Sequence, residues 1–371
     1  MNALTGDSNV ELSAMGDLFE DNLASSLDLL KTKMPEKVNV PPKRRLVGFD
    51  AYQQVIDSDV DVVLLTTPPG FRPQHLKAAI EDGKHAFVGI TTAIDAPGVH
   101  SVLTSSKLAD QKGLAIVSRF CWRCHYGARA ALEKIRNGAI GEIRAIYATY
   151  YTSGLRHKYH SERTPQMTDL EWQIRDWYSY LWLSDDLTLV LAGRHSVDKM
   201  SWWLDDEMPT AAVAVGGRVF PADGNTYDNG FVVYEYANGI RGFLGCRTHD
   251  GCYTSNLDYI IGTKGTCAVG HNPVIDGEVR WRYKGFQKSK HQIEHDELFA
   301  SIRAGKPIND GTRMAHTNLM AIMGRMAAYT GKKVTWKEAF HSQQRLVPEK
   351  MDWNTKVEQL PLAMSGLTTL T

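Results

Sequence analysis

The stretch "DVDVVLLTTPPGFRPQHLKAAIEDGKHAFV", residues 59–88, decides the fold. Its apolar run at 60–67 predicts a buried strand, which the turn "PPGFRP" ends. The segment "PQHLKAAIEDG" then predicts a helix that stops at Gly83, and "HAFVGI" predicts a second strand. A strand, a helix and a strand in succession are typical of a parallel sheet with crossover helices.

The same alternation continues on both sides of this stretch. Residues 10–16 and 45–49 resemble strands, and a further strand is predicted at 114–118. Residues 17–34 resemble a helix, with Leu23, Leu27 and Leu30 at helical spacing. We therefore predict that residues 1–140 form a Rossmann-like dinucleotide-binding domain with a parallel sheet.

The pattern changes at residue 141, where longer strands follow one another and "YANGIRG" signals a hairpin. Residues 141–371 are therefore expected to form a C-terminal α/β domain with an open, mainly antiparallel sheet. One helix, 187–204, should separate the first strand of this sheet from the rest, and helices at 290–340 should pack back on the first domain. The predicted fold class is α/β with two domains.

Composition excludes several classes of partner. Lys plus Arg and Asp plus Glu both number 42, so the net charge is zero and neither nucleic acid nor an anionic membrane is an expected partner. No apolar run reaches the roughly 18 residues that a membrane span needs. The first thirty residues are acidic and amphipathic, unlike a secretory signal. The chain as written is expected to be cytoplasmic, with an export signal further upstream as the alternative.

The five cysteines are too few and odd in number for a disulfide framework. Cys121 and Cys124 form "CWRC" between a strand and a helix, which could suit a redox dithiol. No second CxxC or CxxH pair is present to complete a zinc site, so we expect ordinary buried thiols and no metal.

Several segments together resemble the Gfo/Idh/MocA family of glucose–fructose oxidoreductase and inositol dehydrogenase. The resemblance is carried by residues 59–88 and by "GAIGEIRAIYATY", "GTKGT", "DELFASIRAGKPINDG" and "MAAYTGKKVTWKEA", in family order. It implies a Rossmann domain joined to an α/β domain whose open sheet backs a sugar site. It also implies hydride transfer between NAD(P) and a sugar, cyclitol or glycoside, and a homodimer or tetramer.

This chain departs from three functional marks of that family. The family's glycine loop holds the cofactor pyrophosphate about 20 residues before an acid that binds the ribose. Asp17 matches that acid, but only sixteen residues precede it, so the first strand and the loop are expected to be missing. The resemblance implies NAD or NADP as the cofactor, and Asp17 favours NAD because a carboxylate repels a 2′-phosphate.

The other two marks concern proton transfer. The family's Glu-Lys-Pro after the fourth strand is replaced by Gly89, Ile90 and Thr91, and isoleucine cannot polarise a substrate hydroxyl. The family's acid four residues before a histidine is replaced by Leu191, while the histidine itself is kept as His195. Both changes put an aliphatic group where the family has a polar one.

We name His195 and Lys199, which are i,i+4 neighbours, as candidate catalytic residues. A buried structural histidine and a solvated lysine are the alternatives. The resemblance places the cofactor against five residues: Asp17, Thr67, Pro68, Pro69 and Gly89. Candidate substrate-binding residues lie after the strand at 114–118 and on the open sheet: Arg123, His125, Tyr227, Arg247 and His249.

Three hypotheses about function remain open. In the first, the chain is an NAD(P)-linked oxidoreductase that acts on a sugar, cyclitol or glycoside. In the second, it is an NAD-independent sugar lyase or glycosidase on the same fold, with His195 in the site. In the third, it is a catalytically silent subunit or a carbohydrate-binding homologue.

Overall fold

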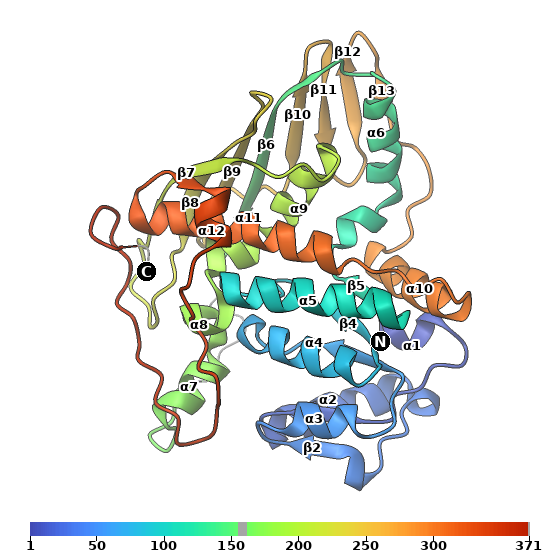
Figure 1. The fold of residues 1–371 in the computed structure, drawn as a ribbon. Coiled ribbons are helices and arrows are strands. Elements are labelled where there is room, and N and C mark those ends of the chain that lie inside the picture. The colour runs from blue at the N-terminus through green and yellow to red at the C-terminus, as the bar shows by residue number, and fades with distance from the viewer. Residues whose placement is uncertain (155–161, 370–371) are drawn as a thin grey trace.

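The computed structural model describes residues 1–154 and 162–369 of the chain (Figure 1). It is a mixed α/β structure with small parallel sheets near the N-terminus and one large mixed sheet in the C-terminal half. The predicted fold class is therefore confirmed. In Figure 1 helices α4, α5 and α11 lie one above another between the two regions.

The N-terminal parallel strands form two separate sheets. β1 (Met15–Asp17) pairs with β2 (Arg45–Val47), and the second sheet consists of three strands: β3 (Val62–Leu65), β4 (His85–Val88) and β5 (Ile116–Ser118). The single parallel sheet predicted from the sequence is thus wrong in one respect, because β1 and β3 share no backbone hydrogen bonds in the described chain. Each strand is only three or four residues long, so each pair is held by few bonds.

The helices of this region are α1 (Asn2–Gly6), α2 (Glu20–Lys33), α3 (Ala51–Ile56), α4 (Arg72–Glu81), α5 (Ala96–Lys112) and α6 (Tyr126–Arg136). Local chemistry accounts for both ends of one of them, α5. Asp95 caps α5 by accepting a hydrogen bond from the Gly98 N–H at 2.8 Å, which satisfies one of the free donors of the first turn. The helix ends at Gly113, whose φ of 65° favours glycine.

The large sheet has nine strands in the order β13-β12-β11-β10-β6-β9-β8-β7-β14. All neighbouring pairs are antiparallel except β6 and β9, which run parallel. The strands are β6 (Ile143–Thr152), β7 (Ala211–Gly217), β8 (Asn229–Glu235), β9 (Arg241–Thr248), β10 (Asp258–Gly262), β11 (Gly265–Val269), β12 (Val274–Gly277), β13 (Trp281–Arg282) and β14 (Val334–Thr335).

Two late helices join the regions. α11 (Gly311–Thr330) is buried along almost its whole length and packs on α5 and on β7, and α10 (Lys290–Arg303) packs on α1 and on the turn η4 (Cys121–Cys124). One hydrophobic cluster, which includes Val99, Met323 and Val232, consequently runs through both regions. No helix in the described chain is both long and apolar enough to span a bilayer.

The helix predicted at 187–204 is divided in the structure. Residues Leu187–Ala192 form the π-helical turn η7, and α9 covers Arg194–Trp203. Three shorter helices complete the C-terminal half: α7 (Asp169–Arg175), α8 (Leu181–Ser184) and α12 (Trp336–Phe340). After α12 the chain continues as a long tail, which Figure 1 shows in red running past α8 and α7.

Candidate active site

His195 lies in the first turn of α9 and is partly buried. Its Nδ1 atom is inaccessible to solvent and has no hydrogen-bond partner among the described residues. Burial lowers the pKa of His195 well below its ordinary value, and neighbouring positive charges lower it further: Arg194, Lys199, Arg119 and His291. The imidazole is therefore neutral at physiological pH, with a ring nitrogen that is free to bond a ligand.

The positive charges around His195 come from separate elements. Arg194 belongs to α9, Arg119 follows β5, and His291 lies in the first turn of α10. Burial lowers the pKa of Arg194 to about 10, and Arg119 contributes to the lowering. Burial also lowers the pKa of Arg72 to about 9, again with contributions from Arg194 and Arg119. A buried group of arginines whose positive charges repel one another favours an electron-rich or anionic ligand between them.

The loop after β4 is part of the core and not of a pocket. Ile90 is only 4% exposed and belongs to the main hydrophobic cluster. Asn318 of α11 accepts hydrogen bonds from the Thr92 N–H at 2.7 Å and the Ala93 N–H at 3.2 Å. Its amide also donates to the Ala93 carbonyl at 2.7 Å. Packing and these hydrogen bonds hold the loop in place. The aliphatic side chain of Ile90 cannot take the role that a lysine would have at this position.

Lys199 is fully buried on α9, and its partners are structural. Its ammonium lies 2.5 Å from a carboxylate oxygen of Asp258, which is equally buried on β10, and 4.4 Å from the centre of the Trp122 ring. These contacts are enough to explain why the Lys199 ammonium is buried here, and no contact with a substrate is needed. We therefore treat it as a positioning residue for α9, and its predicted catalytic role stays a prediction.

The predicted cofactor residues lie at the carboxyl ends of β1, β3 and β4. Asp17 accepts a hydrogen bond from the Phe19 N–H at 2.9 Å, and burial raises the pKa of its carboxyl group. The Thr67 hydroxyl lies 3.2 Å from Nδ1 of His75, and the Thr67 carbonyl accepts a bond from Arg72 at 2.6 Å. The edge formed by these strand ends is where a dinucleotide binds in open parallel sheets.

The rest of that edge is covered by other parts of the chain. Pro68 precedes the turn η3 (Pro69–Phe71), where a Cβ on Gly70 would come within 2.5 Å of the Trp182 carbonyl on α8. A Cβ on Gly89 would meet the Arg72 guanidinium at 3.0 Å. The space beside each of these two glycines is therefore filled by another part of the protein and is not available to a ligand.

The tail contributes Trp353 to the same edge. The Trp353 ring lies 5.9 Å from the ring of Phe19 and 5.0 Å from that of Phe49, and these two residues follow β1 and β2. This is the end of the edge where the adenosine half of a dinucleotide would lie. Asp17 and Thr67 suit a dinucleotide, but the arrangement as it stands does not fit one, because Trp353 covers its adenosine end.

Two predicted substrate-binding residues have structural partners. Arg123 donates to Asp198 at 2.7 Å and is also paired with Asp206, which ties η4 to the region around α9. His125 caps α6, where its Nδ1 accepts a bond from the Ala128 N–H at 3.0 Å, and burial lowers its pKa to about 4. These contacts give both side chains a structural role, and their predicted part in substrate binding stays a prediction.

The remaining three substrate candidates lie at the ends of β8 and β9. The Tyr227 hydroxyl donates to the Ala363 carbonyl of the tail at 3.0 Å. His249 lies 3.1 Å from a carboxylate oxygen of Asp228, and Arg247 lies over the Tyr151 ring at 5.1 Å. The side chain of Leu191, named above as a departure from the family pattern, lies outside what the structure describes.

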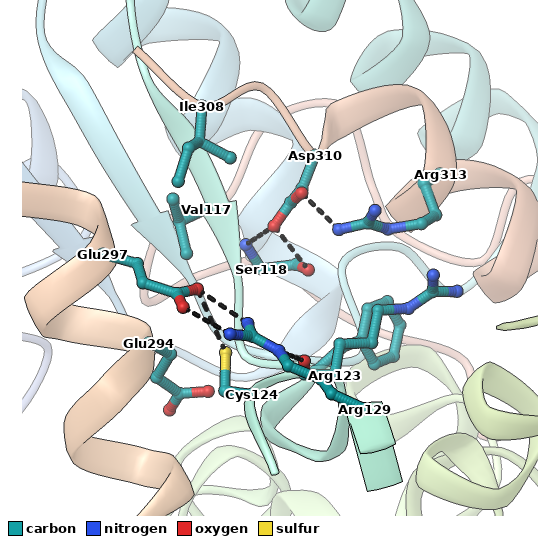
Figure 2. Close-up of a pocket in the computed structure, with 11 residues that line it drawn as sticks. Val117, Ser118, Arg123, Cys124, Arg129, Glu294, Glu297, Ile308, Asp310 and Arg313 are labelled. Carbon is teal, nitrogen blue, oxygen red and sulfur yellow. Dashed lines mark hydrogen bonds and ion pairs between the residues drawn. The ribbon is translucent and has the colours of Figure 1, made fainter. Parts of the chain in front are cut away.

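A pocket of about 230 Å³ lies beyond the carboxyl end of β5 (Figure 2). Its charged groups are mostly paired with one another, since Arg129 binds Glu297 at 2.7 Å and Arg313 binds Asp310. Figure 2 also shows Glu294 on α10 beside this cluster, with no dashed contact. Because most of these charges are paired, the pocket has little net charge with which to attract a charged ligand.

Sequence reasoning missed Arg72, Arg119 and Arg194. Each follows an apolar strand or opens a helix, but nothing in the local pattern shows that the three converge. Their positions in the chain could have indicated them, because Arg119 comes directly after the parallel strand β5 and Arg72 opens the helix that follows the parallel strand β3.

Known proteins share the sequence pattern and the fold of this chain. Residues 128–268 match the family description "GFO/IDH/MocA C-terminal domain". A putative oxidoreductase from Thermotoga maritima has a TM-score of 0.71 at 19% identity, with coverage of 90% of this chain and 96% of that one. A levoglucosan dehydrogenase in complex with NADH and levoglucosan has a TM-score of 0.70 at 16% identity, with coverage of 90% and 94%. Likeness at these identities shows a shared fold.

A sequence relative agrees with that class. Inositol 2-dehydrogenase 3 of Saccharopolyspora erythraea is 25% identical over 185 residues, which are 50% of this chain and 47% of that protein. The match thus spans about half the length of this relative. The fold is shared with these solved oxidoreductases. The resemblance to the Gfo/Idh/MocA family that was inferred from the sequence is confirmed by the match of residues 128–268, by this relative and by the shared fold.

Proposed function

We propose that the chain is a Gfo/Idh/MocA oxidoreductase that acts on a sugar, cyclitol or glycoside through NAD(P)-linked hydride transfer. The observation that supports this most is the neutral, partly buried His195 with a free Nδ1 among several positive charges. Solved structures of this fold include one bound to NADH and levoglucosan and one bound to NADH and UDP-GlcNAcA, which supports a nicotinamide cofactor and a carbohydrate ligand.

The protein groups would act on a substrate hydroxyl as follows. His195 accepts the hydroxyl proton at Nδ1, and this needs the tautomer in which that nitrogen carries no hydrogen. Arg194 and Arg119 stabilise the developing alkoxide charge, which the family's lysine would otherwise do. A bound nicotinamide cofactor would supply the hydride acceptor. Asp17 and the turn Thr67–Pro69 would hold it, once Trp353 has moved away from the adenosine end.

Substitution of His195 tests this proposal. His195→Asn should lower turnover of NAD(P)⁺ with a panel of inositols, aldoses and glycosides by about 10²- to 10⁴-fold, because the proton acceptor is lost. The matched control is His341→Asn, because His341 is exposed after α12 and is not a candidate site residue, so turnover should stay unchanged. Equal turnover by wild type and His195→Asn would contradict the proposed role.

A second candidate function is NAD-independent cleavage of a glycoside on the same fold. It is favoured by Trp353, which covers the adenosine end of the crevice, and by the burial of Ile90 in the core. Product release from glycosides without added NAD(P) would support this candidate over the first. Binding of a carbohydrate without turnover under either condition would support the silent homologue.

We also propose that the open sheet mediates a homo-oligomer. One cross-strand row on this sheet joins Val233, Phe243, Tyr147 and Tyr259 in register. Tyr259 is 39% exposed, and its ring stacks on that of Tyr147 with centroids 6.4 Å apart. An exposed aromatic row is a surface that a second copy can cover. Light scattering on the purified chain measures whether it is a dimer or a tetramer.

A further inference from the structure

We propose that Cys121, His291 and Glu294 form a binding site for one divalent transition-metal ion, with Zn²⁺ as the preferred ion. One potential ligand atom from each residue lies within 4.8 Å of the other two. Three ligands around a tetrahedral zinc ion lie about 3.5 Å from one another, given bond lengths of about 2.0–2.3 Å. Small side-chain rotations are enough to close the site.

Two elements place these ligands. Cys121 opens the turn η4 directly after β5, and His291 and Glu294 are one helical turn apart near the start of α10. η4 and α10 pack against each other, so the thiol faces the helix. Nδ1 of His291 lies 3.6 Å from a carboxylate oxygen of Glu294, which is too long for a hydrogen bond.

Two of the potential ligand atoms are buried and make no hydrogen bond to the described residues. Glu294 is 2% exposed, and its Oε2 has no hydrogen-bond partner among the described residues. Nδ1 of His291 is also buried without a partner there, and Cys121 is 1% exposed. Buried polar atoms of this kind normally have partners, because each one left alone costs about 1–3 kcal/mol. A metal ion would satisfy both of these atoms at once.

The chemical nature of the three ligand atoms determines which metal ion the site prefers. Sulfur, imidazole nitrogen and a single carboxylate suit zinc, whereas magnesium and calcium prefer oxygen alone. A thiolate and a carboxylate together balance the charge of a divalent ion. Lys290, which precedes His291 in the chain, is held over the Trp122 ring at 4.6 Å. No metal is expected from the sequence, because it has no paired Cys and His motif, whereas the ligands here come from segments 170 residues apart.

Three protein ligands leave a fourth coordination position open, which is typical of catalytic zinc sites. His291 is also one of the positive groups that act on His195, so the two sites are neighbours. Resting on the proposed function, a metal here would polarise a substrate oxygen beside His195. That role would add to the stabilisation of the alkoxide charge by Arg194 and Arg119. Metal binding itself does not depend on this role.

The test uses the full chain, stripped with a chelator and titrated with Zn²⁺ or Co²⁺ alone. We expect one ion per chain and, with Co²⁺, a thiolate-to-metal charge-transfer absorption together with the visible bands of tetrahedral cobalt. Cys121→Ser should abolish the charge-transfer band. Glu294→Gln, which keeps the shape of the side chain, should weaken zinc binding by at least about tenfold.

Cys124→Ser and Glu297→Gln are the matched controls. They lie on the same turn and the same helix, and Glu297 is paired with Arg129, so both variants should bind zinc as the wild type does. The absence of a charge-transfer band in the wild type, or equal zinc affinity in the wild type and Glu294→Gln, would overturn the proposal. Because no cofactor or sugar is present, this result is independent of the proposed oxidoreductase activity.

Discussion

The buried pair of Lys199 and Asp258 shows how far a single residue can be interpreted from sequence. The i,i+4 spacing placed Lys199 beside His195 correctly, but it gave no sign of Asp258, which comes from β10 on another part of the chain. Long-range partners of this kind depend on the packing of α9 against the sheet. Local spacing predicts which helix face a residue occupies and not what that face meets.

This pair gives a test of a structural against a catalytic role for Lys199. Lys199→Met should lower the free energy of unfolding by about 3–5 kcal/mol, because it leaves the Asp258 carboxylate buried without its cation. The double variant Lys199→Met/Asp258→Leu should recover most of that loss, since no uncompensated charge remains. Urea denaturation measures both. A stable Lys199→Met variant that has lost only turnover would favour the catalytic role.

His75 predicts a specific pH dependence of stability. It is buried, stacked on Tyr52 at 4.1 Å, and burial lowers its pKa to about 3. The unfolded chain therefore binds a proton below about pH 6.5 that the folded chain does not, so stability falls as the pH drops from about 6.5 toward 3.

The matched variant for this prediction is His75→Gln, which cannot titrate. Below pH 6.5 the wild type should lose about 1.4 kcal/mol more per pH unit than His75→Gln does. Chemical denaturation at a series of pH values measures the difference. Parallel curves for the two proteins would show that His75 titrates normally in the folded state.

Among the elements, the alternation of strands and helices could be predicted, because each has its own apolar period and its own caps. The division of the parallel strands into two sheets could not, because hydrogen bonding between β1 and β3 depends on what lies between them. The break between η7 and α9 was also missed. A continuous apolar pattern at 187–204 does not distinguish a π-helical turn from an α-helix.

The contact of α11 with the loop after β4 is an element-level feature that can be tested. Asn318→Ala would leave the Thr92 and Ala93 N–H groups and the Ala93 carbonyl buried without partners. We expect a loss of at least about 2 kcal/mol in the free energy of unfolding. Thr317→Val is the control, because the Thr317 hydroxyl is buried without a partner and its removal should cost little. Equal stability of the two variants would show that the loop is held by packing alone.

For the whole molecule, the sequence was sufficient to predict the fold class and the family resemblance, because both depend on long, ordered patterns. The site was predictable only in part. His195 was found from the resemblance, whereas its cationic neighbours and the tail residue Trp353 come from segments that only the folded chain brings together. A nicotinamide dinucleotide would have to displace the tail residue Trp353 in order to bind at this edge.

Titration of the purified chain with NADH, followed by fluorescence, tests the proposed oxidoreductase function most directly. We predict saturable binding by the wild type and tighter binding by Trp353→Ala, because the substitution removes the ring that covers the adenosine end. Trp353→Phe keeps an aromatic ring there and should bind as the wild type does. If neither the wild type nor Trp353→Ala binds NADH at millimolar concentration, NAD-linked hydride transfer is contradicted for this chain.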